Sequence, residues 1–185
     1  MENSSFKSIS EIFIKALLGR VHEHAIIKTC DIVFSPELIK ACESNVCGKY
    51  GKSWTCPPGA GSMEEQIKKI MEYSHALIFT TKGDLDDSFD YEGMQETGAV
   101  HNALTQEMHG RFGRAYPVYG AGSCRLCENC AYPEPCRFPE KAFLSLEAAG
   151  INVSELSRAG GIRYNNGENT VTFFSFILYN EIVSD

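Results

Sequence analysis

The chain has 185 residues, which suits one domain spanning residues 1–185 that buries its core without help from disulfides. Its net charge of −7, with no basic run, argues against nucleic-acid binding. The longest apolar run, VTFFSFILY, is far shorter than the roughly 20 residues of a membrane span, and the N-terminus lacks the pattern of a signal peptide. These features predict a cytoplasmic protein, in which clustered cysteines favour metal over disulfides.

The first third of the chain predicts a helix, a strand and a second helix. Apolar residues recur at helical spacing from Phe6 to Leu17, and residues 23–29 (EHAIIKT) form a strand pattern. Residues 35–44 (SPELIKACES) form a short helix, with Ser35 as its N-cap and Pro36 in its first position. A glycine-rich loop follows.

The middle of the chain repeats this alternation. Residues 62–74 predict a helix that begins with a capping box, and residues 75–82 (HALIFTTK) predict a strand covered on both faces. An acidic loop at residues 83–93 then leads into a long helix from about Met94 to Phe112.

The last third adds two strands and two helices. A strand is expected at residues 115–120, helices at 139–150 and 152–161, and a turn at Asn166-Gly167 that leads into a terminal strand. The predicted fold class is therefore α/β: a small sheet with helices packed on it, plus cysteine-rich cluster-binding loops.

The strongest chemical pattern is GSCRLCENCAYPEPC, which holds Cys124, Cys127, Cys130 and Cys136. Three cysteines at successive intervals of three suit the corners of a cubane iron–sulfur cluster, whereas zinc prefers two such pairs held well apart. Five residues precede Cys136, where the bacterial ferredoxin pattern has three. This spacing leaves open whether Cys136 binds the same centre as its neighbours.

A second group consists of Cys42, Cys47 and Cys56, which lie in the glycine-rich loop of residues 42–61. The glycines allow backbone to approach a bulky object, and Tyr50 and Trp54 are placed to exclude water from it. Three cysteines leave one corner free for water, substrate, or an oxygen or nitrogen ligand. A zinc ion that only holds the loop together is the alternative.

Cys30 is a candidate for a further ligand of this second group. It ends the first predicted strand, where a lone cysteine is more often a small buried side chain than a ligand. We therefore expect Cys30 to be buried.

Three stretches carry a family resemblance: CGKYGKSWTCPPGAGS, the segment from RAYPVYGAGSC to EAAGINV, and YNNGENTVTFF. In them the chain resembles the prokaryotic predicted metal-binding proteins of domain-of-unknown-function family 2284, from about Asp31 to the terminal strand. The resemblance implies metal binding by seven cysteines, namely Cys42, Cys47, Cys56, Cys124, Cys127, Cys130 and Cys136. It implies no reaction, and it suggests an anaerobic or metabolically versatile prokaryote as the source.

Several charged or titratable groups are weaker candidates, and for each of them a role as an ordinary surface group is preferred over a role in binding. His22 with His24, His101 with His109, and the acidic loop are all expected to be solvated rather than to bind metal. Arg125, Arg137 and Lys141 surround the four-cysteine stretch, where positive charge favours a reduced cluster or an acidic partner.

The favoured function is electron transfer through one or two four-iron, four-sulfide (4Fe-4S) clusters to a redox protein partner or metabolic enzyme. The first alternative is a small metalloenzyme that uses the open corner of the three-cysteine cluster. The second is a zinc-stapled binding module. Whether the protein is an enzyme stays open, and neither nucleic acid nor a membrane span is expected.

Overall fold

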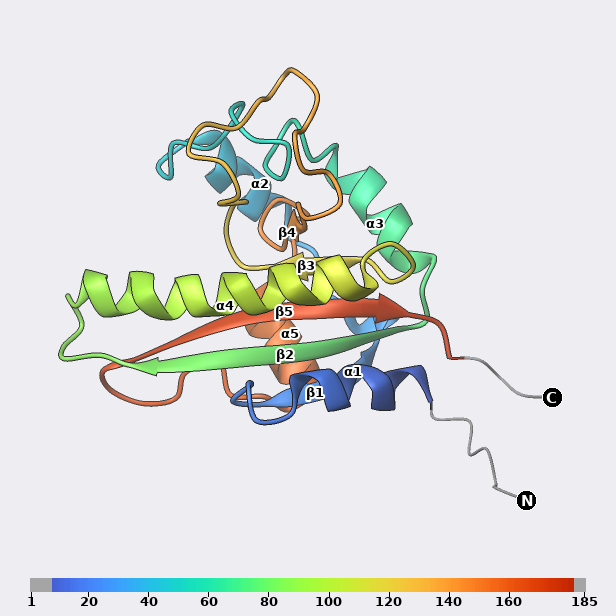
Figure 1. The fold of residues 1–185 in the computed structure, drawn as a ribbon, viewed down its shortest axis with the longest axis vertical. Coiled ribbons are helices and arrows are strands. Elements are labelled where there is room, and N and C mark those ends of the chain that lie inside the picture. Colours follow the sequence, from blue (N-terminus) through green and yellow to red (C-terminus); the bar gives the residue numbers. More distant parts are fainter. Residues whose placement is uncertain (1–7, 182–185) are drawn as a thin grey trace.

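A computed structural model describes residues 8–181 and shows a five-stranded sheet with helices on both faces (Figure 1). The strand order is β1-β2-β5-β3-β4, and every neighbouring pair is antiparallel except β3 and β4. The strands are β1 (His24–Lys28), β2 (His75–Asp84), β3 (Val118–Gly120), β4 (Leu144–Ser145) and β5 (Thr170–Tyr179). The predicted mixed α/β fold with a small sheet is confirmed.

The central strands β2 and β5 pair along their whole length, from His75 opposite Tyr179 to Asp84 opposite Thr170. Successive side chains of a strand point to opposite faces. Leu77 and Phe79 of β2 accordingly enter the core on one face of the sheet, while Ala76 and Ile78 enter the core on the other. The strand is buried on both faces, as its continuous apolar run predicted.

Helices α1 (Ile9–Leu17) and α4 (Tyr91–Phe112) cover one face of the sheet (Figure 1). Phe13 of α1 is fully buried, and its ring meets those of Phe112, Tyr116 and Tyr179 edge-on at centroid distances of 4.9, 5.2 and 5.7 Å. Edge-to-face rings at such distances attract each other beyond the effect of burial alone. This half of the core fixes α4 along the sheet.

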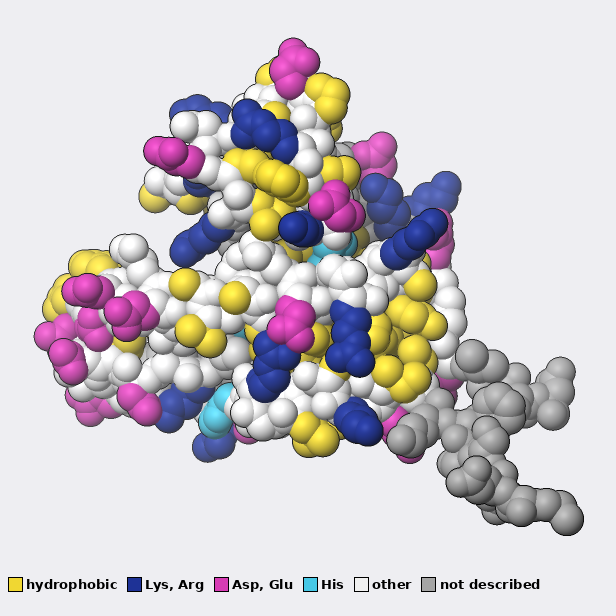
Figure 2. Space-filling view, in the orientation of Figure 1, with side chains coloured by type: hydrophobic (Ala, Val, Ile, Leu, Met, Phe, Trp, Pro, Cys, Tyr) yellow, Lys and Arg dark blue, Asp and Glu magenta, His cyan; other side chains and the backbone are white. Residues whose placement is uncertain are grey.

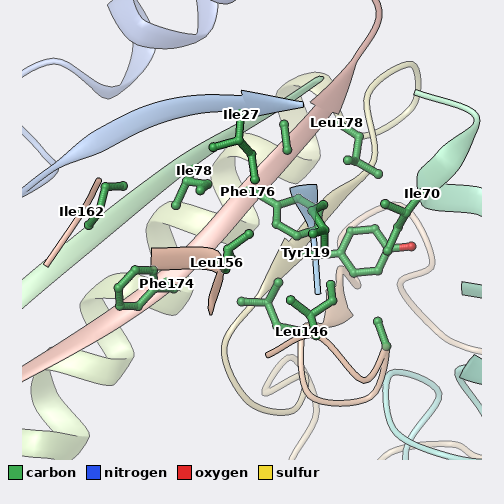
Figure 3. Packing of buried hydrophobic residues seen from close by; sticks show 14 residues of the cluster. Ile27, Ile70, Ile78, Tyr119, Leu146, Leu156, Ile162, Phe174, Phe176 and Leu178 are labelled. Carbon is green, nitrogen blue, oxygen red and sulfur yellow. The ribbon is translucent and has the colours of Figure 1, made fainter. Parts of the chain in front are cut away.

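The opposite face carries α5 (Val153–Gly160) and a core centred on Tyr119 (Figure 3). The Tyr119 ring lies 5.1 Å from that of Phe176, and its hydroxyl donates to Gln66 Oε1 at 2.9 Å. Gln66 is itself buried and donates through Nε2 to the carbonyl of Ala60. A buried polar chain therefore ties β3 to the glycine-rich loop.

Two further helices flank that loop: α2 (Pro36–Glu43) and α3 (Met63–Met71). The predicted capping box at α3 is present, because Glu65 N donates to Ser62 Oγ and Ser62 N donates to Glu65 Oε2. Gly61 precedes it with φ +89°, and a Cβ there would lie 2.6 Å from Glu65 Oε2. Only glycine fits both that backbone conformation and that close approach.

The long helix α4 begins at Tyr91, three residues before the predicted start at Met94. Asp90 is its N-cap and accepts from Gly93 N at 2.8 Å. The carboxylate satisfies an amide at the end of the helix that would otherwise lack a partner. Part of the expected acidic loop is therefore the first turn of the helix.

The predicted helix at residues 139–150 is wrong, because that segment forms turns and the two-residue strand β4. Phe143 packs into the core on the α4 face, whereas Leu146 and Ile151 pack into the core on the α5 face. Leu146 N donates to the carbonyl of Gly120 in β3. A segment that serves both faces and an edge of the sheet cannot remain one helix.

At the N-terminus, α1 confirms the amphipathic helix from Ile9 to Leu17, whereas Phe6 lies outside the described residues. Among residues 8–181, no helix combines the length and the apolar character needed to cross a membrane.

Candidate metal centre

The candidate site is built from two loops that lie together beyond the β3–β4 edge of the sheet (Figure 1). The first loop, residues 44–62, joins α2 to α3, and the second loop, residues 121–143, joins β3 to β4. Trp54 Nε1 donates to the carbonyl of Glu134 at 2.8 Å, and the Trp54 ring meets that of Tyr132 edge-on at 5.0 Å. These contacts hold the loops against each other.

Thr55 makes the central polar link between the two loops. Its side chain is 2% exposed, and its Oγ1 accepts from Cys124 N at 2.9 Å. Ser53 Oγ in turn lies 3.2 Å from Thr55 Oγ1. The backbone at the start of the four-cysteine stretch is thus fixed by a buried hydroxyl of the first loop.

Packing between the loops is close enough to require a glycine at position 59. A Cβ there would lie 2.6 Å from the carbonyl of Ser53 and 3.0 Å from Tyr132 Cε2. Gly59 thus serves close packing both within the first loop and against the second.

All four cysteines of the second loop line one small cavity, together with Ser53, Trp54 and Thr55 of the first loop. The cavity holds about 20 Å³, roughly the space of one water molecule. Its four thiols are Cys124, Cys127, Cys130 and Cys136. The longer gap before Cys136 therefore does not carry that residue away from its neighbours.

The surroundings of Cys130 favour its thiolate form. Desolvation by burial raises the pKa of Cys130, but hydrogen bonds from the amides of Tyr132, Trp54 and Ala131 and from the Ser53 hydroxyl outweigh it. The net pKa lies below the ordinary value for cysteine. Hydrogen bonds to the charged form stabilise it, and the thiolate is the form that binds metal.

Cys124 has the opposite balance. Burial raises its pKa most, a hydrogen bond from the Leu126 amide lowers it, and the negative charges of Cys136, Cys130 and Cys127 raise it further. The four groups are close enough to repel one another when ionised, so a bound cation would relieve that repulsion.

The three cysteines of the other group line one cleft of about 910 Å³. Cys42 comes from α2, Cys47 from the turn after it and Cys56 from within the first loop. Burial raises the pKa of Cys56 to about 11. Burial, then the charges of Glu147 and Cys47, raise the pKa of Cys42.

The two groups adjoin each other, since Cys124 and Cys127 line both the small cavity and the cleft. This proximity was not visible in the sequence, where residues 63–120 separate the two loops. The cleft continues beside a pocket of about 310 Å³, with which it shares Gly122, Arg125 and Glu147.

Cys30 is exposed, contrary to the expectation that it is buried. It lies in a short 3-10 turn at Thr29–Asp31, and its Sγ lies 3.9 Å from Asp31 Oδ1. The strand ends before it, so the side chain never enters the sheet. Cys30 lines neither the cavity nor the cleft.

The basic residues near the site have different surroundings. Arg137 Nη1 donates to the carbonyl of Asn129 at 3.0 Å and so braces the second loop. Lys141 Nζ lies 5.8 Å from the ring centroid of Phe138, and Arg125 lines the cleft. Figure 2 shows Lys and Arg side chains beside hydrophobic ones on this part of the surface.

The histidines lie away from both cysteine groups, and His101 departs from its prediction. His101 is only 2% exposed, not solvated, and its ring bonds to Thr81 Oγ1 and Ser175 Oγ at 2.9 and 2.8 Å. His109 is half-buried, whereas His22 is exposed and meets Asn166 Oδ1 at 2.9 Å. His24 is exposed as expected.

Two aspartates of the acidic loop have partners within the protein. Asp90 caps the helix and also accepts from Asp86 N at 3.1 Å, and Asp84 pairs with Lys82 at 2.9 Å. Acidic side chains gather where β2 leads into α4 (Figure 2).

Sequence reasoning overlooked three residues of the site: Thr55, Tyr132 and Glu147. A signal existed only for Glu147, which is the single charged residue between Phe143 and Ile151.

Within residues 8–181, no three His, Cys, Asp or Glu side chains are close enough together to hold one metal ion.

A mixed α/β fold that brings seven thiols into two adjoining cavities defines a candidate metal-binding protein. A family model agrees: the one described as "Predicted metal-binding protein (DUF2284)" matches residues 25–179. The match covers most of the chain, which therefore belongs to this family, as the three stretches quoted from the sequence predicted. No curated protein and no solved structure matches the chain.

Proposed function

We propose that the protein binds iron–sulfur clusters and transfers electrons to a redox protein or metabolic enzyme. The observation that carries the proposal is the convergence of four thiols on one cavity. Cys124, Cys127, Cys130 and Cys136 would hold a 4Fe-4S cluster, and Cys42, Cys47 and Cys56 a second one. Such clusters supply reversible one-electron chemistry.

The residues of the chain fit an iron–sulfur cluster both in the type of ligand atom and in their surroundings. Cysteine thiolates are the standard ligands of iron–sulfur clusters, and hydrogen bonds to their sulfurs tune the potential. Trp54 lines the small cavity, and its ring packs edge-on against that of Tyr132. Because its present space suits one water molecule, the second loop has to widen to accept a four-iron cage.

The adjoining positions of the two groups favour electron relay. Cys124 and Cys127 belong to both cavities, so an electron that moves between the two centres would cross a short stretch of protein. Arg125 and Arg137 add positive charge at the same end of the molecule, which suits an acidic redox partner. Eight free thiols suit the reducing environment of the cytoplasm.

A metalloenzyme is the second candidate, and the continuous space at the three-cysteine group favours it. The cleft of about 910 Å³ and the neighbouring pocket of about 310 Å³ would admit a small molecule to an iron that lacks a fourth thiolate. Electron transfer remains our main proposal, because all four thiols of the second loop line one small cavity.

Metal analysis tests the proposal. Protein purified without oxygen should be brown and contain iron and acid-labile sulfide in equal amounts, about eight of each per chain for two 4Fe-4S clusters. The Cys124→Ser variant should lose the spectrum of one cluster, whereas Cys30→Ser, the matched control, should keep both. A colourless protein that contains only zinc would refute the proposal and leave the zinc-stapled module.

A further inference from the structure

Glu147 is the carboxylate that meets the three-cysteine group. It lines the same cleft as Cys42, Cys47 and Cys56, and it is half-buried in a segment whose other residues are largely buried. An acidic side chain therefore borders the same cleft as three thiols that are candidate ligands.

Hydrogen bonds fix this carboxylate through one of its two oxygens. Ser145 Oγ donates to Glu147 Oε2 at 2.6 Å, and Gly122 N donates to the same oxygen at 3.0 Å. Within residues 8–181, no basic side chain forms an ion pair with Glu147. Carboxylates that bind metal are commonly oriented by hydrogen bonds of this kind.

On the basis of the proposed function, we propose that Glu147 supplies a fourth, oxygen ligand to the iron–sulfur centre of Cys42, Cys47 and Cys56. Its Oε2 is oriented by Ser145 and Gly122, and Oε1 is the oxygen available to the iron. Three thiolates leave one iron of a cubane without a cysteine, and iron accepts carboxylate oxygen.

Other side chains in the cleft fit this position less well. Glu128 also lines the cleft, but it is exposed. Gln95 is neutral. Glu147 combines negative charge, partial burial at the cleft and hydrogen bonds that orient its carboxylate.

A structural role of Glu147 has to be separated from ligation. The same hydrogen bonds tie Gly122, near the start of the second loop, to β4 and the turn after it, so removal of the side chain could disturb the loop. Glu147→Gln keeps an oxygen that accepts from Gly122 N and Ser145 Oγ but removes the negative charge. Glu147→Ala removes both, and the pair therefore distinguishes the two roles.

The experiment compares wild type, Glu147→Gln, Glu147→Ala and Glu128→Gln after anaerobic reconstitution with iron-57 and sulfide. Mössbauer spectra report the ligands of each iron, and paramagnetic resonance after mild oxidation reports loss of one iron to give a three-iron cluster. We expect wild type to show one iron subsite with a higher isomer shift than the thiolate-bound irons. Glu147→Gln should alter that subsite and form the three-iron signal about tenfold faster or more, as loss of support at a metal site weakens binding by about that factor.

Glu128→Gln should match wild type in both measurements. The inference is overturned if Glu147→Gln behaves as wild type, including when only Glu147→Ala shows a defect, since that pattern belongs to a structural contact. It is equally overturned if Glu128→Gln causes the change, or if the wild type shows no distinct subsite. A protein that takes up no iron and sulfide fails the proposed function itself, which is a different result from a bound cluster without a special iron.

Discussion

His101 lies in the middle of α4 at the centre of a buried polar network. Its two ring nitrogens bond to Thr81 and Ser175, and Thr105 Oγ1 lies 2.9 Å from the same Ser175 Oγ. Desolvation by burial lowers the pKa of His101 to about 4, against a small opposing effect from the backbone of Phe174. The ring is therefore neutral at physiological pH and cannot gain a proton without disturbing the core.

This depressed pKa predicts acid sensitivity of the fold. Between pH 6.5 and 4 the unfolded chain binds a proton at His101 that the folded chain does not, so stability is lost as pH falls through this window. The loss from this group alone should be about 2 kcal/mol between pH 7 and pH 5. Urea unfolding of metal-free protein at the two pH values measures it.

Replacement of His101 by Gln provides the comparison, because Gln offers a donor and an acceptor but does not titrate. His101→Gln should lower stability at pH 7 and reduce the difference between the two pH values by about 2 kcal/mol. If the variant keeps the full pH dependence of the wild type, the burial of a neutral His101 is not its cause.

The prediction that His101 is solvated is wrong because a polar side chain is not necessarily exposed. His101, Asn102 and Thr105 are polar, yet all three are buried. His101 and Thr105 satisfy their polar atoms with other side chains and with the backbone. A pattern of polar and apolar residues along one helix cannot show that partners exist on β2 and β5.

At the scale of elements, α3 anchors the end of the first loop. Its capping box satisfies two amides at the point where the chain leaves the glycine-rich segment, and its buried Gln66 reaches both Ala60 and Tyr119. The carbonyl of Cys56 in turn accepts from Ala60 N at 2.9 Å. Cys56 is thereby connected to the core through α3.

Removal of the cap should destabilise the fold by a modest amount. Ser62→Ala leaves Glu65 N without its acceptor and should lower the free energy of unfolding by about 1 kcal/mol. Glu65→Ala should cost a similar amount, and the double variant should cost less than the two together, because the two bonds form one reciprocal motif. Denaturant unfolding of the four proteins gives the values, and full additivity would argue against a working box.

Local patterns predicted the elements well where one face of a helix or strand decides its burial. The capping box of α3, the first position of α2 and the continuous apolar run of β2 all have causes within a few residues. Residues 139–150 failed because their apolar residues pack into both cores and their backbone bonds reach β3. A proline at the first position and a glycine at the last are typical of helix ends. They do not exclude another structure that tertiary contacts favour.

At the scale of the whole molecule, the sequence places Cys124, Cys127, Cys130 and Cys136 in one stretch, but it does not show how that stretch lies relative to the other cysteine group. The contact of that loop with residues 53–55, and the approach of Glu147 to the cleft, arise only when the sheet brings distant segments together. No local pattern contains this information.

The division between a well-packed sheet and two irregular loops predicts how cluster binding acts on dynamics. The apolar core clusters lie on the two faces of the sheet, whereas residues 44–62 and 121–143 contain no described helix or strand. A bound group that contacts only the folded loops makes their local unfolding rarer, and the effect grows with its affinity. The strands should keep their own protection against hydrogen exchange.

Hydrogen exchange of the metal-free and the reconstituted protein measures this effect. Amides of both loops should exchange about tenfold more slowly or better with clusters bound, and amides of β2 and β5 should exchange at the same rate in both forms. In Cys56→Ser the protection should weaken mainly in the first loop, with Cys30→Ser as the unaffected control. Equal slowing of the loops and of β2 and β5 would instead mean that the sheet itself needs the metal to fold.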